Sequence, residues 1–337
     1  MIRSKVLITL LWHLSLFGSM LFAACHVSAT LYLVEQGLGQ AEVLWNRQSV
    51  TEFTAQHDLS AREKENLGLI RHLKAFSVDS LGYAPTADFE QVYDQQNEAL
   101  IWLVTASEPF QIRPYTWTFP LIGEVSYKGY FSRWEALREQ SRLRSLGYDT
   151  ELSPVSAWST LGWFRDPILS ENLKLKKGQF CNLMLHELFH ATYYASDAVN
   201  QNENLAMFVA DKATRMYLKS DSAALSDYLH TSHTQRIINA YLQRQMEDLN
   251  SNYRKHRGHS NLQSLKNKWI AMICDSLELL PVSDTVRLHR LRHKLKVSGN
   301  ACFIGFSQYN SLQDSLDKVF NKIYKDNLIA KIVFIKK

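Results

Sequence analysis

Two histidines near the middle of the chain have the spacing of a metal site. His186 and His190 are four residues apart, so on a helix their imidazoles lie one turn apart on the same face. Glu187 stands between them, where a carboxylate can accept a proton from a water molecule. The pattern His-Glu-Xaa-Xaa-His therefore predicts zinc and metal-activated water chemistry. The alternative is a core helix whose polar side chains are hydrogen-bonded, which is costly because each buried imidazole or carboxylate then needs a partner.

Glu203 is the candidate for the third metal ligand. A catalytic zinc ion usually takes three protein ligands and keeps one position for water. Ser196, Asp197 and Asn200 break the first helix, and a second helical run of apolar residues begins just after Glu203. The spacing predicts a helical hairpin with Glu203 in the first turn of its second helix, facing the histidine pair. The alternative is an acid that the helix dipole favours at that position.

Several side chains near these ligands could support the chemistry. Tyr193, Tyr194 and Tyr309 are candidates for a hydrogen-bond donor to the carbonyl oxygen as negative charge develops on it, although a core position is the stronger interpretation of each. Asp197 could orient a ligating histidine or cap the second helix. Asn202, next to the third ligand, is a further candidate for such a supporting position.

A short aromatic segment lies upstream of the predicted metal helix. Residues 156–164 favour a β-strand, and in zinc proteases with this helix pair a strand edge beside the metal commonly lines the substrate cleft. An extended peptide can add to such an edge through main-chain hydrogen bonds. The candidate positions for that contact are Ser159, Thr160, Leu161 and Gly162. An ordinary core strand with packed tryptophans is the alternative.

The composition describes an ordinary folded protein with a real core. The chain has 337 residues, of which 46% are hydrophobic and 21% charged, and this excludes a disordered chain. The formal net charge of +5 is mild for this length, and the sequence predicts no nucleic-acid partner. The cysteines match no metal-knuckle spacing. We expect Cys181 to be a packed core residue, and the sequence leaves a disulfide between Cys274 and Cys302 open.

The first residues predict attachment to a membrane. Arg3 and Lys5 precede an apolar run from Val6 to Ala24, which has the form of a secretory signal. Cys25 follows in a sequence similar to a bacterial lipobox, so it is a candidate for lipidation. An uncleaved signal anchor is the alternative, since the apolar span is long enough to cross a bilayer, and a free secreted protein is a third. The first two interpretations place the body in the cell envelope, on the periplasmic side and anchored to the membrane.

The remaining pattern predicts an α+β protein that is mostly helical, with a small β-sheet in the N-terminal half and a helical C-terminal half. We expect a signal or membrane-anchor segment at residues 1–24 and an N-terminal α/β part at residues 25–165. A helical part with the zinc site follows at residues 166–337, and the last two parts form one catalytic unit.

Local signals place the individual elements. Gly37 and Gly39 are expected to interrupt the first helical run, and Ser60-Ala61-Arg62-Glu63 has the pattern of a capping box that opens the next helix. Predicted β-segments are Ala99–Ala106, Trp117–Ile122 and Val125–Phe131. Further predicted helices are Trp134–Leu146 followed by Gly147, Leu225–Arg254, Leu262–Leu279 and Thr285–Leu295.

Taken together, these residues resemble a bacterial family of predicted aminopeptidases, zinc peptidases with a lipoprotein-like or membrane-anchoring N-terminus. The resemblance extends over nearly the whole chain. Its most specific parts are the run Ser159–Phe164 and the joint HExxH and NExxA motifs that contain His186 and Glu203. Supporting motifs are Trp117–Pro120, Gly123, Tyr127–Phe131, Gly147–Asp149, Asp166-Pro167 and Asn300-Ala301.

The resemblance implies a zincin-like metallopeptidase with a gluzincin-type site. In such a site His186, His190 and Glu203 bind one Zn²⁺ per chain, and Glu187 is the catalytic base. The implied partner is a peptide or protein substrate. Gln201 stands where an aromatic residue commonly precedes the Asn-Glu pair, but it is not one of the implied ligands.

The kind of peptidase stays open at the level of sequence. Removal of a single N-terminal residue requires an acidic group that holds the α-ammonium, and no glycine-rich acidic signature of the large zinc aminopeptidases precedes His186. An endopeptidase is therefore an alternative to an aminopeptidase. A non-catalytic zinc-binding envelope protein and a membrane-anchored interaction protein with a vestigial site are others, and the intact set of site residues argues against the last. The sequence predicts no oligomeric state.

Overall fold

The structure, a computed structural model, describes residues 31–119, 123–155, 165–195, 198–310 and 316–318, and positions 320, 322, 327 and 328. The chain divides into two compact units, residues 1–46 and residues 47–337. In the first unit, residues 31–46 form one continuous helix. The predicted interruption at Gly37 and Gly39 is wrong, because a glycine inside a helix costs about 1 kcal/mol without ending it.

The described part of the chain begins at Leu31. Within the described residues, no helix is both long and apolar enough to span a bilayer. The predicted signal or anchor segment, residues 1–24, and Cys25 lie outside the described part of the chain.

The second unit opens with two helices that start at capping boxes. Helix α2 (Val50–Gln56) begins after Ser49, and helix α3 (Ala61–Asp79) begins after Ser60. In each box the serine hydroxyl accepts a hydrogen bond from the backbone N–H three residues on, and the glutamate there accepts one from the serine N–H. The predicted start of α3 is confirmed.

Short strands form small sheets in the N-terminal half, as predicted. Their orders are β1-β2-β8, β6-β3-β7 and β4-β5. The strands are β1 (Gln48–Ser49), β2 (Gln91–Tyr93), β3 (Ile101–Ser107), β4 (Trp117–Phe119), β5 (Gly123–Val125), β6 (Lys128–Tyr130), β7 (Asp149–Val155) and β8 (Ile168–Leu169). The antiparallel pair β3-β7 runs from Ile101 opposite Val155 to Ser107 opposite Asp149.

The predicted β-segment Val125–Phe131 differs from the structure. It divides at Ser126 and Tyr127 into the end of β5 and the whole of β6, which belong to different sheets. A strand that changes sheet has to interrupt its hydrogen-bond ladder, and local β-propensity carries no signal for that interruption.

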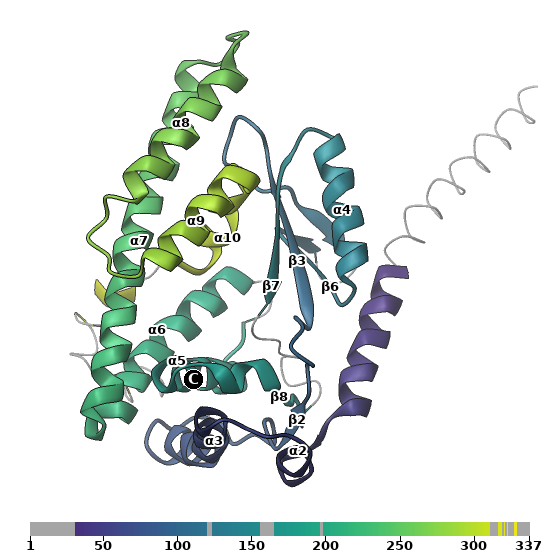
Figure 1. The fold of residues 1–337 in the computed structure, drawn as a ribbon, viewed down its shortest axis with the longest axis vertical. Coiled ribbons are helices and arrows are strands. Elements are labelled where there is room, and N and C mark those ends of the chain that lie inside the picture. The colour runs from purple at the N-terminus through teal and green to yellow at the C-terminus, as the bar shows by residue number, and fades with distance from the viewer. Residues whose placement is uncertain are drawn as a thin grey trace, which may run out of the picture. The chain divides into compact units, whose positions relative to one another are not determined.

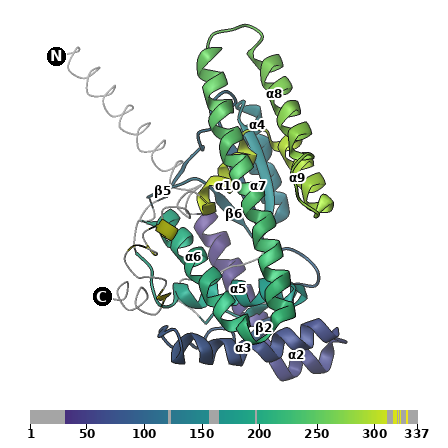
Figure 2. The same ribbon diagram turned by 90° about the vertical axis from the view of Figure 1, so that its left-hand side faces the viewer.

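Helices cover both faces of the β6-β3-β7 sheet (Figure 1). Helix α4 (Arg133–Ser145) packs on one face, and α9 (Thr285–Ser298) and α10 (Ala301–Asn310) pack on the other. As predicted, α4 ends before Gly147, whose φ of 88° is the left-handed conformation that glycine permits. Helices α7 (Ser222–Lys255) and α8 (Leu262–Leu277) lie side by side (Figure 2). The predicted mostly helical α+β fold with a helical C-terminal half is confirmed.

Two hydrophobic cores stabilise the second unit. The first packs α3 with α5 (Lys177–His190) and α6 (Val199–Tyr217), and the second packs α7, α8 and α9 with the start of α10. Cys181 is fully buried in the first core, which confirms its predicted position. Cys274 and Cys302 are free thiols buried in the second.

A buried ion pair joins the β-sheet to the second core. The Lys266 ammonium on α8 donates to both carboxylate oxygens of Asp149, at 2.7 and 2.6 Å. The backbone N–H of Asn300 donates to the same carboxylate at 2.6 Å. The Asn300 side chain accepts a hydrogen bond from Tyr253 and donates to two carbonyls of the loop after β3. Asp149 and Asn300, from two of the supporting motifs, thus belong to one junction, which we call the Asp149 junction.

Replacement of Gly299 by alanine is expected to loosen this junction. Gly299 has φ of 52°, and a Cβ atom there would overlap the Asp149 carboxylate. Gly258 has φ of 86° but open space around its Cβ position, so Gly258→Ala introduces only the backbone strain of about 1 kcal/mol. Urea unfolding should therefore show a larger loss of stability for Gly299→Ala than for Gly258→Ala. Equal losses would mean that the Asp149 carboxylate moves aside freely.

Candidate metal centre

Helix α5 is fixed in the core by the face opposite its two histidines. Leu185, Leu188 and Phe189 are almost fully buried, and they hold the helix in the core that α5 shares with α6. The helical period then places His186 and His190 together on one remaining face. His190 is itself buried, with a relative exposure of 7%.

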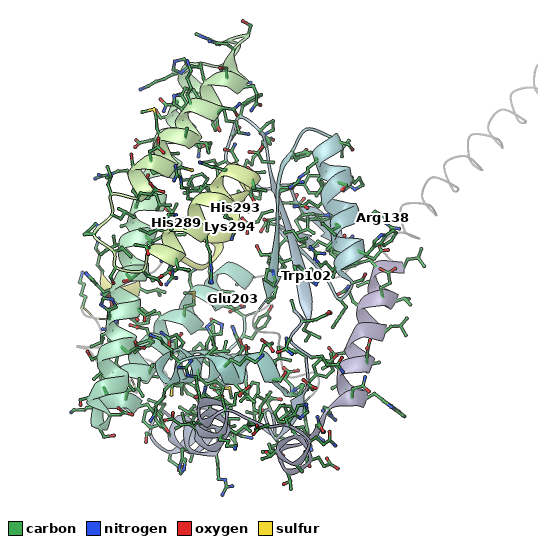
Figure 3. The ribbon with its side chains drawn as sticks, viewed as in Figure 1. Trp102, Arg138, Glu203, His289, His293 and Lys294 are labelled. Carbon is green, nitrogen blue, oxygen red and sulfur yellow. The ribbon has the colours of Figure 1, made fainter. Side chains whose placement is uncertain are left out.

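Helix α6 brings Glu203 to this face. Glu203, Ala206, Ala210 and Ala213 follow the helical period along one side of α6, and the three alanines are fully buried in the core shared with α5. Their small side chains permit a close approach of the two helices. Figure 3 labels Glu203 near the beginning of α6, above α5 in that view.

The expected position of Glu203 within its helix needs a correction. Helix α6 begins at Val199, so Glu203 lies in its second turn instead of its first. The side chain of Asn202, which is 1% exposed, stabilises the start of α6 at Val199. Its amide oxygen accepts from the Ala195 N–H at 3.0 Å, and its amide nitrogen donates to the Ala195 carbonyl at 2.8 Å. Asn202 therefore fixes the backbone of the segment that connects α5 and α6, and this helps to position Glu203 next to the histidines.

The three predicted ligands meet in one cluster. The Nε2 atoms of His186 and His190 are 3.1 Å apart. One carboxylate oxygen of Glu203 is 3.3 Å from Nε2 of His186, and the other is 3.5 Å from Nε2 of His190. Among the described residues, this is the group of histidine, cysteine and acidic side chains whose ligand atoms could hold a metal ion.

The donor set and its spacing fit a divalent metal. Nitrogen ligands at about 2.0–2.1 Å from a tetrahedral zinc ion lie about 3.3 Å from each other. The observed separations of 3.1, 3.3 and 3.5 Å bracket that value. Two imidazoles and a carboxylate are also ligands that zinc and related transition metals accept. Nδ1 of His190 is buried and has no hydrogen-bond partner among the described residues.

The Glu203 carboxylate has the charge that a metal ligand needs. Burial by itself would raise the pKa of Glu203, but its hydrogen bonds to His186 and His190 and the charges of both lower the pKa to about 2. Burial opposes the charged form of His186, yet its hydrogen bond to Glu203 and the charges of Glu187 and Glu203 raise the pKa of His186. Glu203 is therefore an anion at neutral pH, as a carboxylate ligand must be.

Glu187 is half-buried and lies in a largely apolar environment. It borders a small hollow with room for about one water molecule, and the other lining residues are Phe89, Pro167, Ile168, Leu169, Asn172, Leu183 and Met184. Burial raises the pKa of the Glu187 carboxyl, and the charges of Glu203 and Asp166 add to the rise while the two histidines oppose it. A carboxylate with a raised pKa is a better proton acceptor near neutral pH.

Tyr127 and Asp166 belong to the surroundings of this cluster, and the sequence analysis did not give either a functional position. Burial raises the pKa of Tyr127, and the charges of Glu203 and Tyr194 raise it further, so the phenol is within electrostatic range of the third ligand. Asp166 is 3% exposed, and its charge reaches Glu187. The one available signal was that both lie in segments shared with the resembled family.

The other predicted site residues have varied outcomes. Tyr193 is half-buried and packs near Phe189, with 6.2 Å between ring centroids, while Tyr194 is 39% exposed. Tyr309 lies in α10, and its side chain is outside the described part of the structure. Asp197 and the predicted substrate strand Ser159, Thr160, Leu161 and Gly162 lie outside the described residues, so these predictions stay predictions.

Fold and cluster together define a mostly helical α+β protein with a candidate metal centre on two packed helices. The chain belongs to the family described as "Putative aminopeptidase", whose model matches residues 31–330. Membership implies a peptidase and a peptide substrate. Neither a curated protein nor a solved structure matches this chain.

Proposed function

We propose that the protein is a zinc-dependent peptidase of the cell envelope. The observation that carries the proposal is the cluster of His186, His190 and Glu203 with ligand atoms 3.1–3.5 Å apart, next to the Glu187 carboxylate. Family membership supports peptide hydrolysis as the reaction. The intact donor set favours zinc, which takes two histidines and one glutamate in known hydrolytic sites.

Each residue of the centre has a defined part in this reaction. His186, His190 and Glu203 would hold the zinc ion, which when bound lowers the pKa of a water molecule and polarises the peptide carbonyl. Glu187 accepts the proton of the attacking water and can deliver it to the leaving amine. Its apolar surroundings raise its pKa and so fit it for both transfers.

Tyr127 is our candidate for the donor to the carbonyl oxygen. Its pKa is raised, so its hydroxyl keeps its proton at neutral pH and can donate a hydrogen bond as negative charge develops. Of the predicted donors, Tyr194 also acts electrostatically on Tyr127, whereas Tyr193 packs in the core.

Replacement of Tyr127 by phenylalanine is expected to lower kcat by about 100-fold, with little change in KM or metal content. This is the effect of removing one donor that acts mainly in the transition state. Tyr193→Phe is the matched control, since it removes a hydroxyl from a half-buried tyrosine just beyond the end of α5 and should change kcat only slightly. Steady-state kinetics on one peptide substrate checks both. An unchanged kcat in Tyr127→Phe would remove Tyr127 from the mechanism.

Aminopeptidase specificity is the finer part of the proposal, and an endopeptidase is the second candidate. Cleavage profiling of the purified chain on peptides with free and acetylated N-termini separates them. An aminopeptidase releases single N-terminal residues and leaves acetylated peptides intact, whereas an endopeptidase cuts both sets. Bound metal without cleavage of any peptide would instead favour the non-catalytic zinc-binding protein.

We further propose that the N-terminal segment holds the body at the membrane on the periplasmic side. The support is the basic start and apolar run of residues 1–24 and the lipobox-like position of Cys25. Lipidation predicts that Cys25→Ser releases the protein into the soluble fraction or leaves its signal uncleaved. If the segment is an uncleaved anchor, the parent protein and the Cys25→Ser variant should both remain associated with the membrane. Recovery of both the parent protein and the variant in the soluble periplasm would contradict membrane attachment.

A further inference from the structure

Positive charge is concentrated in one part of the chain. Residues 249–297, which we call the basic segment, comprise the end of α7, all of α8 and most of α9. They contain ten arginines and lysines and three acidic residues, a net charge of +7. Because the whole chain carries +5, all residues outside this segment together carry −2. The mild overall charge therefore conceals a strongly basic region.

The basic segment has more cations than its ion pairs use, including the pairs with acids outside the segment. Lys266 pairs with Asp149, Lys294 with Glu151, and Arg292 with Asp275 and Glu278. Six further cations are exposed and have no ion pair within the described part of the structure: Arg254, Lys255, Arg257, Lys268, Arg290 and Lys296.

Helix α9 presents one continuous outer face with both cations and apolar side chains. Its exposed residues follow the helical period, while Leu288 and Leu295 on the opposite side are buried in the second core. The residues of this outer face are Val286, His289, Arg290, His293, Lys296 and Val297. Figure 3 labels two of them, His289 and His293, on α9. No acidic residue occurs in α9 at all.

Two valines on this face are largely exposed. Val286 and Val297 are each 57% exposed, and they lie near the two ends of the same stripe as Arg290 and Lys296. Elsewhere in the basic segment Met272 is 65% exposed and Leu279 84% exposed. Exposed cations are attracted to the headgroups of an anionic membrane, and aliphatic side chains beside them can contact the acyl boundary.

We propose that the outer face of α9 docks on an anionic phospholipid surface. A nucleic acid would satisfy the cations but would offer the exposed valines no apolar partner, so a bilayer fits the whole face better. The proposal is independent of peptidase activity. It assigns to the body of the protein a second membrane contact besides the N-terminal segment, and it predicts that charged lipids orient the body on the membrane.

The test uses the full-length chain with a polarity-sensitive thiol dye on Val286→Cys, in vesicles of phosphatidylcholine with or without roughly one third phosphatidylglycerol. The described cysteines Cys181, Cys274 and Cys302 are buried, and the unsubstituted chain labelled in parallel supplies the background. We expect a blue-shifted emission on the anionic vesicles only, and a return toward the emission in water as salt is raised.

Charge reversal distinguishes this face from the N-terminal segment, which every variant retains. Arg290→Glu with Lys296→Glu should weaken dye insertion by about 30-fold or more, since each cation near an anionic surface contributes about 1 kcal/mol. The matched control is Lys64→Glu with Arg71→Glu, two exposed cations about two turns apart on one face of α3, which should insert as the parent does. The proposal is overturned if the emission does not shift on anionic vesicles, if it shifts equally on neutral ones, or if the control loses insertion to the same extent.

Discussion

Replacement of Glu187 by glutamine is expected to lower kcat by at least about 1,000-fold while the protein keeps its metal. The amide has the shape of the carboxylate but cannot accept a proton from the attacking water, so it removes general-base catalysis alone. The ligand atoms of the cluster come from His186, His190 and Glu203, which the substitution leaves in place. Kinetics on a cleaved peptide and elemental analysis of the same preparation measure both quantities.

The control for this variant is Glu171→Gln, another glutamate-to-glutamine change in the second unit. Glu171 forms a partly exposed ion pair with Lys174 and is not part of the cluster, so its loss should leave kcat unchanged. If Glu187→Gln cleaved peptides at the parental rate, Glu187 would not be the base. If it lost activity together with its metal, the variant would report on folding of the site and the isosteric argument would fail.

Replacement of Lys266 by methionine is expected to destabilise the protein by about 3–5 kcal/mol. The substitution removes the ammonium and leaves the Asp149 carboxylate in a largely buried position without its cation, which is the costly way to break an ion pair. Lys266 is 4% exposed, so solvent does little to weaken the pair. Urea unfolding should show the loss as a lower transition midpoint.

Two further variants make this result specific to the Asp149 junction. Arg138→Met breaks an exposed ion pair with Glu135 and should cost less than about 1 kcal/mol. Asp149→Asn combined with Lys266→Met removes both charges and should recover part of the stability lost in the single variant. Equal effects of Lys266→Met and Arg138→Met would show that the buried pair contributes no more than a surface pair.

The ligands of the candidate metal centre could be predicted because local periodicity determines them. A four-residue spacing on a helix places His186 and His190 on one face whatever the remainder of the fold. Glu203 could also be predicted as a ligand, because a short connection between two helices makes them antiparallel neighbours. The helix that carries it starts earlier than expected, because the Asn202 side chain holds the backbone of Ala195, and a single sequence gives no sign of that contact.

Long-range contacts account for the features that sequence could not supply. Tyr127 reaches the surroundings of Glu203 from a break between two short strands, 76 positions earlier in the chain. The Asp149 junction joins residues 117 positions apart through one carboxylate. Such contacts depend on how the sheets and helices pack together. The pattern of charged and hydrophobic residues in the sequence does not indicate them. By contrast, the capping box at Ser60 and the glycine at 147 act within one turn of chain, and both were predictable.

The basic segment shows a different limit of sequence reasoning. The chain-wide charge of +5 predicts nothing unusual, and a helical pattern alone does not tell which cations are paired. Only the packed structure shows that Lys266, Arg292 and Lys294 are used internally while Arg290 and Lys296 remain exposed. The basic outer face of α9 can therefore be identified only from the fold.

The metal content of the purified chain tests the central claim most directly. Elemental analysis should find about one zinc ion per chain, and His190→Ala should lower that content to near zero because it removes one of three ligands. The parent chain should also lose peptide cleavage on chelation and regain it when zinc is restored. A parent chain that binds no metal, or a His190→Ala variant with undiminished metal content, would contradict the assignment of His186, His190 and Glu203 as a metal centre.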